Sequence, residues 1–327
     1  MAKRRIVSGM RPTGKLHLGH LRGALLNWKK LQEEFQCFYF IADWHALTSD
    51  YANTEIIKES TYDIIMDWIS VGLDPEQSTF FIQSHIKEHA ELYLLFSMLT
   101  PLPWLERNPT YKEQLKELSH KDIFTYGFLG YPVLQAADIL MYKAIGVPVG
   151  EDQAPHVELT REIARRFNNV YQEIFPVPKL LLAPTSKILG TDRRKMSKSY
   201  GNAIFLTDTD KEIDSKVGQM ITDPQRARKT DPGDPEICNV FFFHEIYTDK
   251  STCKEIHAGC KSAEIGCVQC KKMMAEGLKE GLAPIKAKRR ELESQLDKVR
   301  EIVNDGNDRA RSIARETMAQ VREAVKI

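Results

Sequence analysis

Two histidines lie close together near the start of the chain, in the segment Thr13-Gly14-Lys15-Leu16-His17-Leu18-Gly19-His20. Glycines let the backbone approach a phosphate or an adenine ring, and a helix N-terminus favours negative charge. His17 and His20 can therefore both face one anion. Taken alone, the segment fits an ordinary strand-to-helix turn with solvated histidines equally well, because short glycine motifs are weak indicators.

Two lysines and two serines form a second candidate segment, Lys195-Met196-Ser197-Lys198-Ser199, between Gly190 and Gly201. Lysines beside small hydroxyl residues in a glycine-bounded loop can act as a mobile cationic clamp. Such a clamp suits a transferring phosphate, whose oxygens gain charge in the transition state. A lone pentapeptide of this kind also fits a charged surface loop.

In this order, the two segments resemble the HIGH and KMSKS motifs of the class I aminoacyl-tRNA synthetases. The resemblance implies a Rossmann-type catalytic domain, a helical domain that contacts tRNA, and ATP with Mg²⁺. It also implies that the protein is a ligase with four catalytic side chains, His17, His20, Lys195 and Lys198.

An acidic residue interrupts the apolar segment Tyr131-Pro132-Val133-Leu134-Gln135-Ala136-Ala137-Asp138-Ile139-Leu140-Met141-Tyr142. Indole is a large apolar ring with one N–H donor and no acceptor, so a pocket for it needs apolar walls and one acceptor. Asp138 can supply that acceptor. The other interpretation is a helix-capping or structural acid, although a buried carboxylate requires a specific partner.

This segment, followed by VPVGEDQ at 147–153, is similar to the bacterial tryptophanyl members of the class. The resemblance implies activation of L-tryptophan with ATP and its transfer to tRNA(Trp). Substrate contacts are implied for Asp138, Tyr131, Gln135, Gln153, His45 and Val7, with Gln135 and Val7 standing where many members have Met and Phe. ATP contacts are implied for Met10, Arg11, Thr13, Gly19, His20, Gly150, Glu151, Asp152, Lys195, Met196, Ser197, Lys198 and Ser199.

Three alternative functions differ in what they require of the pocket, the lysine loop or the helical domain. A tyrosyl enzyme has the same architecture, but its pocket must serve a hydroxyl that both donates and accepts. A non-catalytic RNA-binding relative usually loses the lysine loop or the pocket. A nucleotidyltransferase with the H-x-G-H turn has no need of a cysteine-bearing helical domain.

Five of the six cysteines fall between Cys238 and Cys270. Clustered cysteines in an intracellular protein favour a metal site over disulfides. Cys238, Cys260, Cys267 and Cys270 offer four thiolates, and a subset of tryptophanyl enzymes with a near-identical arrangement holds a four-iron, four-sulfur cluster. Zinc is the main alternative, with Cys253 or His257 as a replacement ligand.

Alternating segments must position these residues. Strands are predicted at 5–8, 37–42, 79–82 and 147–149, and helices at about 20–35, 54–72 and 153–167. This alternation predicts an α/β fold with a parallel, doubly wound sheet. We expect residues 1–205 to form the Rossmann-type catalytic domain and residues 206–327 an α-helical tRNA-binding domain, ending in helices at 285–303 and 307–325.

Composition and the lack of targeting signals bear on the partners and the cellular location of the protein. The chain has 46 Lys and Arg against 45 Asp and Glu, so an RNA partner must meet a local basic surface, for which the run Lys286–Arg290 is a candidate. We find no signal peptide and no apolar segment long enough to span a membrane, which predicts a cytoplasmic protein. Class relatives with this layout are symmetric dimers, so we expect a homodimer.

Overall fold

The computed structural model describes residues 3–117, 122–182 and 188–327, and its contacts divide the chain into two compact units. The first unit comprises Met1–Gly14, Ala24–Thr185 and Leu292–Ile327, and the second comprises Lys15–Gly23 and Ser186–Glu291. This division differs from the predicted boundary at residue 205. The reason is that the segment after residue 186 packs with the second unit, whereas the C-terminal helix returns to the first. The functional division of the chain stays a prediction.

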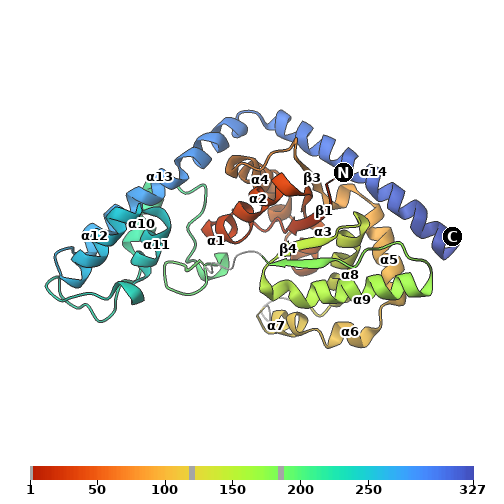
Figure 1. The fold of residues 1–327 in the computed structure, drawn as a ribbon, viewed down its shortest axis with the longest axis horizontal. Helices are drawn as coiled ribbons and strands as arrows, with labels where there is room; N and C mark the ends of the chain where they lie inside the picture. The colour runs from red at the N-terminus through yellow and green to blue at the C-terminus, as the bar shows by residue number, and fades with distance from the viewer. Residues whose placement is uncertain (1–2, 118–121, 183–187) are drawn as a thin grey trace. The chain divides into compact units, whose positions relative to one another are not determined.

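The first unit is built on a five-stranded parallel sheet (Figure 1). Its strands are β1 (Arg5–Met10), β2 (Gln36–Ile41), β3 (Ser78–Ile82), β4 (Gly146–Val149) and β5 (Lys179–Leu182), in the order β3-β2-β1-β4-β5. The central strand β2 is apolar along its length because helices cover both faces of a parallel sheet. The predicted α/β fold of Rossmann type is confirmed.

Strands β1 and β4 separate toward their carboxyl ends. β1 pairs with β2 from Arg5 to Met10, whereas it pairs with β4 only through Ile6 and Gly146. Pro148 in β4 has no N–H to donate, and its carbonyl accepts a hydrogen bond from Ser8 Oγ (3.2 Å). The strand order reverses direction between β1 and β4, and open α/β sheets bind their ligands in the crevice at such a point.

Helices and short helical turns complete the described residues. They are α1 (Leu18–His20), η1 (Leu21–Leu25), α2 (Leu26–Glu34), α3 (Asp43–Asp50), α4 (Glu55–Val71), η2 (Gln83–His85), α5 (Glu88–Leu99), α6 (Leu102–Glu106), α7 (Pro109–Glu117), α8 (Tyr126–Met141), η3 (Glu151–Gln153), α9 (Ala154–Val170), η4 (Lys198–Tyr200), α10 (Asp210–Gly218), η5 (Pro235–Ile237), α11 (Asn239–Tyr247), α12 (Lys250–Lys261), α13 (Cys267–Glu293) and α14 (Leu296–Val325).

The predicted elements are present, with three differences. The helix expected at 20–35 begins at Leu18 and contains the π-helical turn η1. Strand β5 was not predicted, because its four residues carry no alternating pattern long enough to identify. The last two helices meet at residues 294–295 and not near residue 305. Gly306 lies inside α14, where helix packing holds a residue that usually ends a helix.

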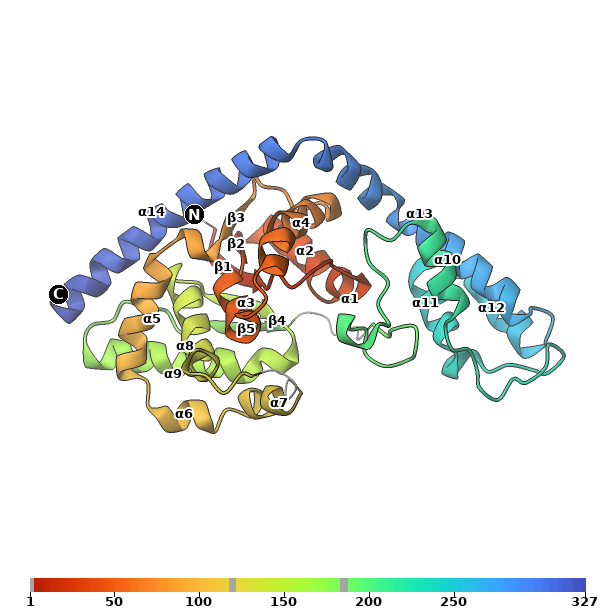
Figure 2. The ribbon, with the colours of Figure 1, turned by 180° about the vertical axis from the view of Figure 1, so that it is seen from behind.

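Helix α14 covers the edge of the sheet at β3, as Figures 1 and 2 show from opposite sides. A Cβ on Gly306 would lie 1.7 Å from the Phe80 carbonyl oxygen, so only glycine permits this approach. Asn307 Oδ1 accepts a hydrogen bond from the Ile82 N–H (3.0 Å), which satisfies a donor of an edge strand. Ala310 and Met318 continue into the main apolar core. The C-terminal helix is therefore part of the fold of the first unit.

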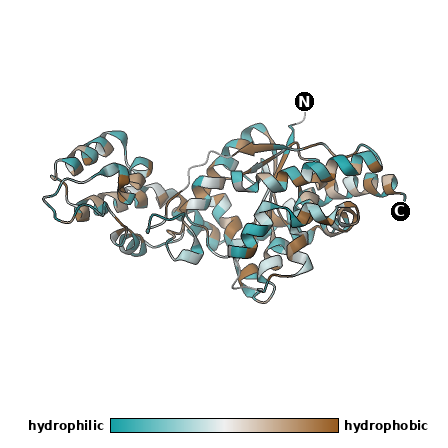
Figure 3. Cartoon of the chain, turned by 90° about the horizontal axis from the view of Figure 1, so that it is seen from below, coloured by the Kyte–Doolittle hydropathy of each residue, from teal (hydrophilic) through white to brown (hydrophobic). Residues whose placement is uncertain are grey.

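The helices are amphipathic, and Figure 3 shows hydrophilic and hydrophobic residues alternating along them. In α4, Ile57, Ile64 and Trp68 are buried, and the helix ends at Gly72 in the left-handed conformation. In the described part of the chain, no helix is both long enough and apolar enough to cross a membrane.

Candidate active site

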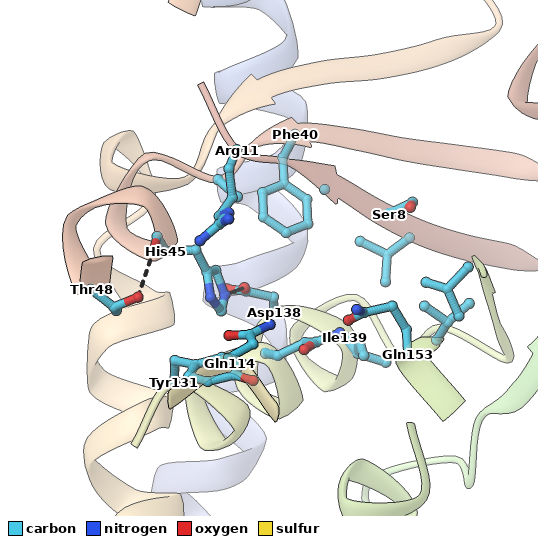
Figure 4. Close-up of a pocket in the computed structure, with 16 residues that line it drawn as sticks. Ser8, Arg11, Phe40, His45, Thr48, Gln114, Tyr131, Asp138, Ile139 and Gln153 are labelled. Carbon is cyan, nitrogen blue, oxygen red and sulfur yellow. Dashed lines mark hydrogen bonds and ion pairs between the residues drawn. The ribbon is translucent and has the colours of Figure 1, made fainter. Parts of the chain in front are cut away.

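A cavity of about 250 Å³ opens at the carboxyl ends of β1, β2 and β4 (Figure 4). All six residues expected to contact the amino acid line it, from β1, α3, α8 and η3. The full lining is Val7, Ser8, Gly9, Arg11, Phe40, Ala42, His45, Thr48, Gln114, Tyr131, Gln135, Asp138, Ile139, Val147, Val149 and Gln153. Sequence reasoning missed the apolar walls Phe40, Val147 and Val149 and the polar Gln114, because buried strand residues and isolated glutamines carry no distinguishing pattern.

Asp138 is the most heavily bonded residue of the cavity. Its side chain is 1% exposed, and three side chains donate to its two carboxylate oxygens. His45 Nε2–H donates to Oδ2 (2.7 Å), His89 Nδ1–H donates to Oδ1 (2.6 Å), and Gln83 Nε2 donates to both (2.8 and 2.9 Å). α3, η2 and α5 thus bring three donors to this carboxylate, and its neighbours in the sequence do not reveal them.

The network around Asp138 keeps the carboxylate ionised. Burial by itself would raise the pKa of Asp138, but the hydrogen bonds from His45 and His89 outweigh it and lower the pKa below its usual value. Behind His89, Tyr142 donates its hydroxyl to His89 Nε2 (2.7 Å), since burial and the charge of Asp138 raise the pKa of Tyr142 well above 10. The relay fixes one tautomer of His89.

Tyr131 is held on the other side of the cavity. Its hydroxyl lies 2.8 Å from Nε2 of His156, a fully buried residue. Asn108 Nδ2 donates to the other ring nitrogen of His156 (3.3 Å), so the neutral ring carries its proton on Nε2 and donates to the Tyr131 oxygen. Burial raises the pKa of Tyr131, which keeps the phenol neutral.

The histidine segment is an unusual helix N-terminus in the second unit. His17 Nδ1 accepts from the Gly19 N–H (3.1 Å), and His20 Nδ1 accepts from the His17 N–H (3.1 Å). A Cβ on Gly19 would lie 2.8 Å from the His17 ring, which explains the glycine. Burial, and then Lys198, lower the pKa of His17 to about 4. Burial, then His17 and Lys198, lower the pKa of His20 well below 6.5. Both rings are neutral, with Nε2–H available as a donor.

The lysine loop is built around Asn202, which is 2% exposed. Asn202 donates to Asp192 Oδ1 (2.7 Å) and to the Lys195 carbonyl (3.2 Å), and it accepts from the Ser197 N–H (2.8 Å). Met196 is buried, whereas Lys195 is exposed and Lys198 and Ser199 lie in or beside the short turn η4. These hydrogen bonds hold the backbone of the loop, from which the side chains of Lys195 and Lys198 extend.

The structure brings the histidine segment and the lysine loop together within the second unit. Leu18 N–H donates to the Ile204 carbonyl (3.0 Å), and Leu206 N–H donates to the Leu16 carbonyl (3.0 Å). The charge of Lys198 reaches both histidines, since it lowers the pKa of each. This pairing of distant segments makes one polar surface with neutral and cationic donors, which suits a polyphosphate.

The remaining expected ATP contacts lie in the first unit. Met10 ends β1, Arg11 and Thr13 follow it, and Gly150 and Glu151 follow β4, so both segments lie at the same edge of the sheet. Arg11 also lines the amino-acid cavity, and its contact with ATP stays a prediction. Asp152 belongs to η3, but its side chain is outside the described residues.

Comparison with known proteins decides the family. The pattern of the tRNA synthetases class I (W and Y) matches residues 2–283. The chain belongs to this family. It is 53% identical to a tryptophan–tRNA ligase of Thermotoga maritima (99% of both chains) and 48% identical to one of Aquifex aeolicus (99% of this chain, 100% of the relative). A tryptophanyl-tRNA synthetase of Campylobacter jejuni, solved with ADP and tryptophan, superposes with a TM-score of 0.92 at 34% identity, covering 99% and 100% of the two chains.

Membership of the class I synthetases places ATP with Mg²⁺ among the substrates of this chain. The neutral imidazoles of His17 and His20 and the positive charges of Lys195 and Lys198, all in the second unit, fit a magnesium-bound triphosphate.

The basic run Lys286–Arg290, the candidate surface for RNA, is partly occupied by contacts within the second unit. Lys286 pairs with Asp210 (2.8 Å), Lys288 pairs with Glu291 (2.9 Å), and Arg289 is 7% exposed.

The four expected metal ligands all lie in the second unit of this synthetase. Burial, and then the neighbouring thiols of Cys238, Cys260 and Cys267, raise the pKa of Cys270 to about 12. A Cβ on Gly233 would lie 2.7 Å from Cys260 Sγ, so glycine leaves room for that thiol. Among the described residues, no three or more His, Cys, Asp or Glu side chains are gathered around a single metal ion position.

The neutral state of His17 predicts a loss of stability in acid. The unfolded chain protonates this residue near pH 6.5, whereas the folded chain does so only near pH 4. The contribution to the free energy of unfolding is therefore intact above pH 6.5 and falls as the pH drops toward 4, by on the order of 3 kcal/mol. In denaturant unfolding, His17→Asn, which keeps an N-cap acceptor, should lose less stability between pH 7 and 4 than the unmodified chain. Equal losses in both would contradict a buried neutral His17.

Proposed function

We propose that this protein is a tryptophan–tRNA ligase that activates L-tryptophan with ATP and transfers it to tRNA(Trp). The observation that carries the proposal is the cavity between β1 and β4, which combines apolar walls with an ionised, buried carboxylate network. Full-length identity of about one half to tryptophan–tRNA ligases supports the choice of amino acid. Likeness to tyrosyl enzymes, such as that of Archaeoglobus fulgidus at 21% identity, extends only to the fold.

The cavity accounts for the recognition of tryptophan. The indole ring packs against Val7, Phe40 and Val147, and the Asp138–His45 pair meets the indole N–H. Tyr131 and Gln153 receive the ammonium group. A site built around a substrate hydrogen bond rejects ligands that lack it, since its own polar groups would stay unpaired.

The phosphate-facing residues act on the other substrate. His17 and His20 donate from Nε2, and Lys195 and Lys198 stabilise charge that develops on the leaving pyrophosphate. Mg²⁺ bound to ATP neutralises further phosphate charge. Gly150 and Glu151, which follow β4, are proposed to approach the ribose of ATP.

The chemistry proceeds in two steps. A carboxylate oxygen of tryptophan attacks the α-phosphorus, the bond to the β-phosphate breaks, and pyrophosphate leaves with the electron pair. The 2′-hydroxyl of the terminal tRNA ribose then attacks the activated carbonyl, and AMP leaves. Both steps have a competent nucleophile and leaving group, so the protein acts by positioning and by charge stabilisation.

ATP–pyrophosphate exchange with each amino acid tests this function. Exchange that depends on tryptophan supports it. Exchange that depends on tyrosine would identify a tyrosyl enzyme, and no exchange with either, in protein that binds tRNA, would identify a non-catalytic relative.

For the cysteine site, we propose a four-iron, four-sulfur cluster held by Cys238, Cys260, Cys267 and Cys270. The influence of Cys238, Cys260 and Cys267 on the pKa of Cys270 supports it, together with the space that Gly233 leaves for the Cys260 thiol. Zinc is the alternative occupant, because four thiolates also suit a tetrahedral zinc site. When bound, the cluster supplies redox-active iron within the region expected to meet tRNA.

Anaerobically purified protein should show visible sulfur-to-iron absorbance and about four irons per chain. Cys267→Ser should remove most of the iron, whereas Cys253→Ser, a change in the same region outside the proposed ligand set, should leave it in place. A colourless protein with one zinc per chain would reject the cluster.

A homodimer is also proposed. α5 exposes Leu94 (54%) and Met98 (72%), and Phe124 (81%) and Tyr126 (68%) lie before and at the start of α8, which packs against α5. Large exposed apolar side chains on two neighbouring helices are typical of an interface between subunits. Sedimentation equilibrium measures the mass directly.

A further inference from the structure

Arg11 lines the amino-acid cavity, although the family resemblance implied a contact with ATP for this residue. It directly follows β1, and Figure 4 shows its side chain reaching into the cavity beside His45. The backbone around it is tightly set: the Thr13 N–H donates to the Arg11 carbonyl (2.9 Å), and Pro12 restricts the conformation of Arg11. The loop thus aims a guanidinium at the mouth of the cavity.

The charge of Arg11 has no partner of opposite sign in the part of the chain that the structure describes. Its single hydrogen bond runs from Nη1 to Ser49 Oγ (3.2 Å), and Ser49 in turn donates to Asp50 Oδ2 (2.8 Å). The cavity's own acid, Asp138, is engaged by three other donors. Most of the donors of the guanidinium are therefore available to a ligand.

The position of Arg11 relative to Tyr131 indicates which ligand group it meets. Its positive charge acts on the Tyr131 hydroxyl, where it opposes the effect of burial on the pKa of that phenol. Tyr131 and Gln153 lie where the substrate's ammonium group is proposed to bind. A free amino acid carries its carboxylate on the same carbon as this ammonium group, so a cation that lines the same cavity as Tyr131 is placed to meet the carboxylate.

We propose that Arg11 binds the carboxylate of the amino-acid substrate through its guanidinium. This inference rests on the proposed function. Guanidinium and carboxylate match as paired, charge-assisted hydrogen bonds, which orient the carboxylate as well as hold it. Arg11 thereby selects an intact amino acid over the corresponding amine and presents the oxygen that attacks ATP.

The test compares two ligands in two variants. L-tryptophan and tryptamine differ by the carboxylate alone. Arg11→Gln should weaken L-tryptophan binding, measured by calorimetry, by roughly 10- to 100-fold, the range for a lost charge-assisted contact. The inhibition constant of tryptamine in ATP–pyrophosphate exchange should change less than about twofold. The affinity of Arg11→Lys for L-tryptophan should lie between those of the unmodified protein and of Arg11→Gln, because lysine keeps the charge but not the paired geometry.

Arg4→Gln is the matched control, since Arg4 is exposed and precedes the opposite end of β1. This variant should bind L-tryptophan and tryptamine as the unmodified protein does. Equal losses for tryptophan and tryptamine in Arg11→Gln, or a loss confined to ATP, would overturn the assignment. If the unmodified protein binds tryptophan but the variant binds it equally well, only this inference fails. If the unmodified protein does not bind tryptophan, the proposed function fails.

Discussion

Lys195→Ala is expected to slow formation of tryptophanyl-adenylate by roughly 10²- to 10³-fold, while the affinity for tryptophan changes little. The Lys195 side chain is exposed, whereas its backbone pairs with Leu189 and its carbonyl accepts from Asn202, so removal of the side chain leaves the loop's backbone contacts intact. Its charge is needed most when the α–β phosphate bond breaks and pyrophosphate gains charge. An interaction that strengthens in the transition state affects the rate more than the binding of the ground state.

Single-turnover release of pyrophosphate measures the activation step, and calorimetry measures tryptophan affinity. Lys211→Ala is the control, because Lys211 is an exposed lysine of α10 in the same unit. It should leave the rate unchanged. An unchanged rate in Lys195→Ala would remove this lysine from the chemistry.

Asp138→Asn should lower kcat/KM for tryptophan by roughly 10²-fold or more. The carboxylate accepts from His45, His89 and Gln83, but a carboxamide has one acceptor oxygen and turns an N–H₂ group toward donors. At least one buried donor then has no acceptor. The position that meets the indole nitrogen shifts as well.

Thermal unfolding separates this effect from loss of the fold. His89→Gln is a milder variant, because glutamine can donate to Asp138 while it breaks the relay to Tyr142. It should raise KM for tryptophan with a smaller change in kcat. Asp305→Asn, the same change at an exposed position of α14, should have no effect. Normal tryptophan kinetics in a folded Asp138→Asn variant would show that the carboxylate takes no part in recognition.

Local patterns were sufficient for much of the fold. Apolar runs predicted strands β1 to β4 within a few residues, because strand and helix periodicities follow from backbone geometry alone. The histidine segment, the lysine loop and Asp138 were also found from residue type and spacing. For these features, neighbouring residues in the sequence are enough to indicate the chemistry.

The partners of those residues depended on distant segments. His89 and Gln83 come from α5 and η2, about 50 residues before Asp138, and neither carries a motif. The placement of α14 in the first unit required Gly306 to meet the backbone of β3, more than 200 residues away.

Residue types and local periodicity were enough to indicate the class of fold, the family and most residues able to do chemistry. Which of these groups meet depends on packing between segments far apart in the chain. The divergence of β1 and β4, the three donors around Asp138 and the turn of Arg11 toward the amino-acid cavity all arise in this way. Such contacts depend on the whole fold, so a local pattern does not encode them.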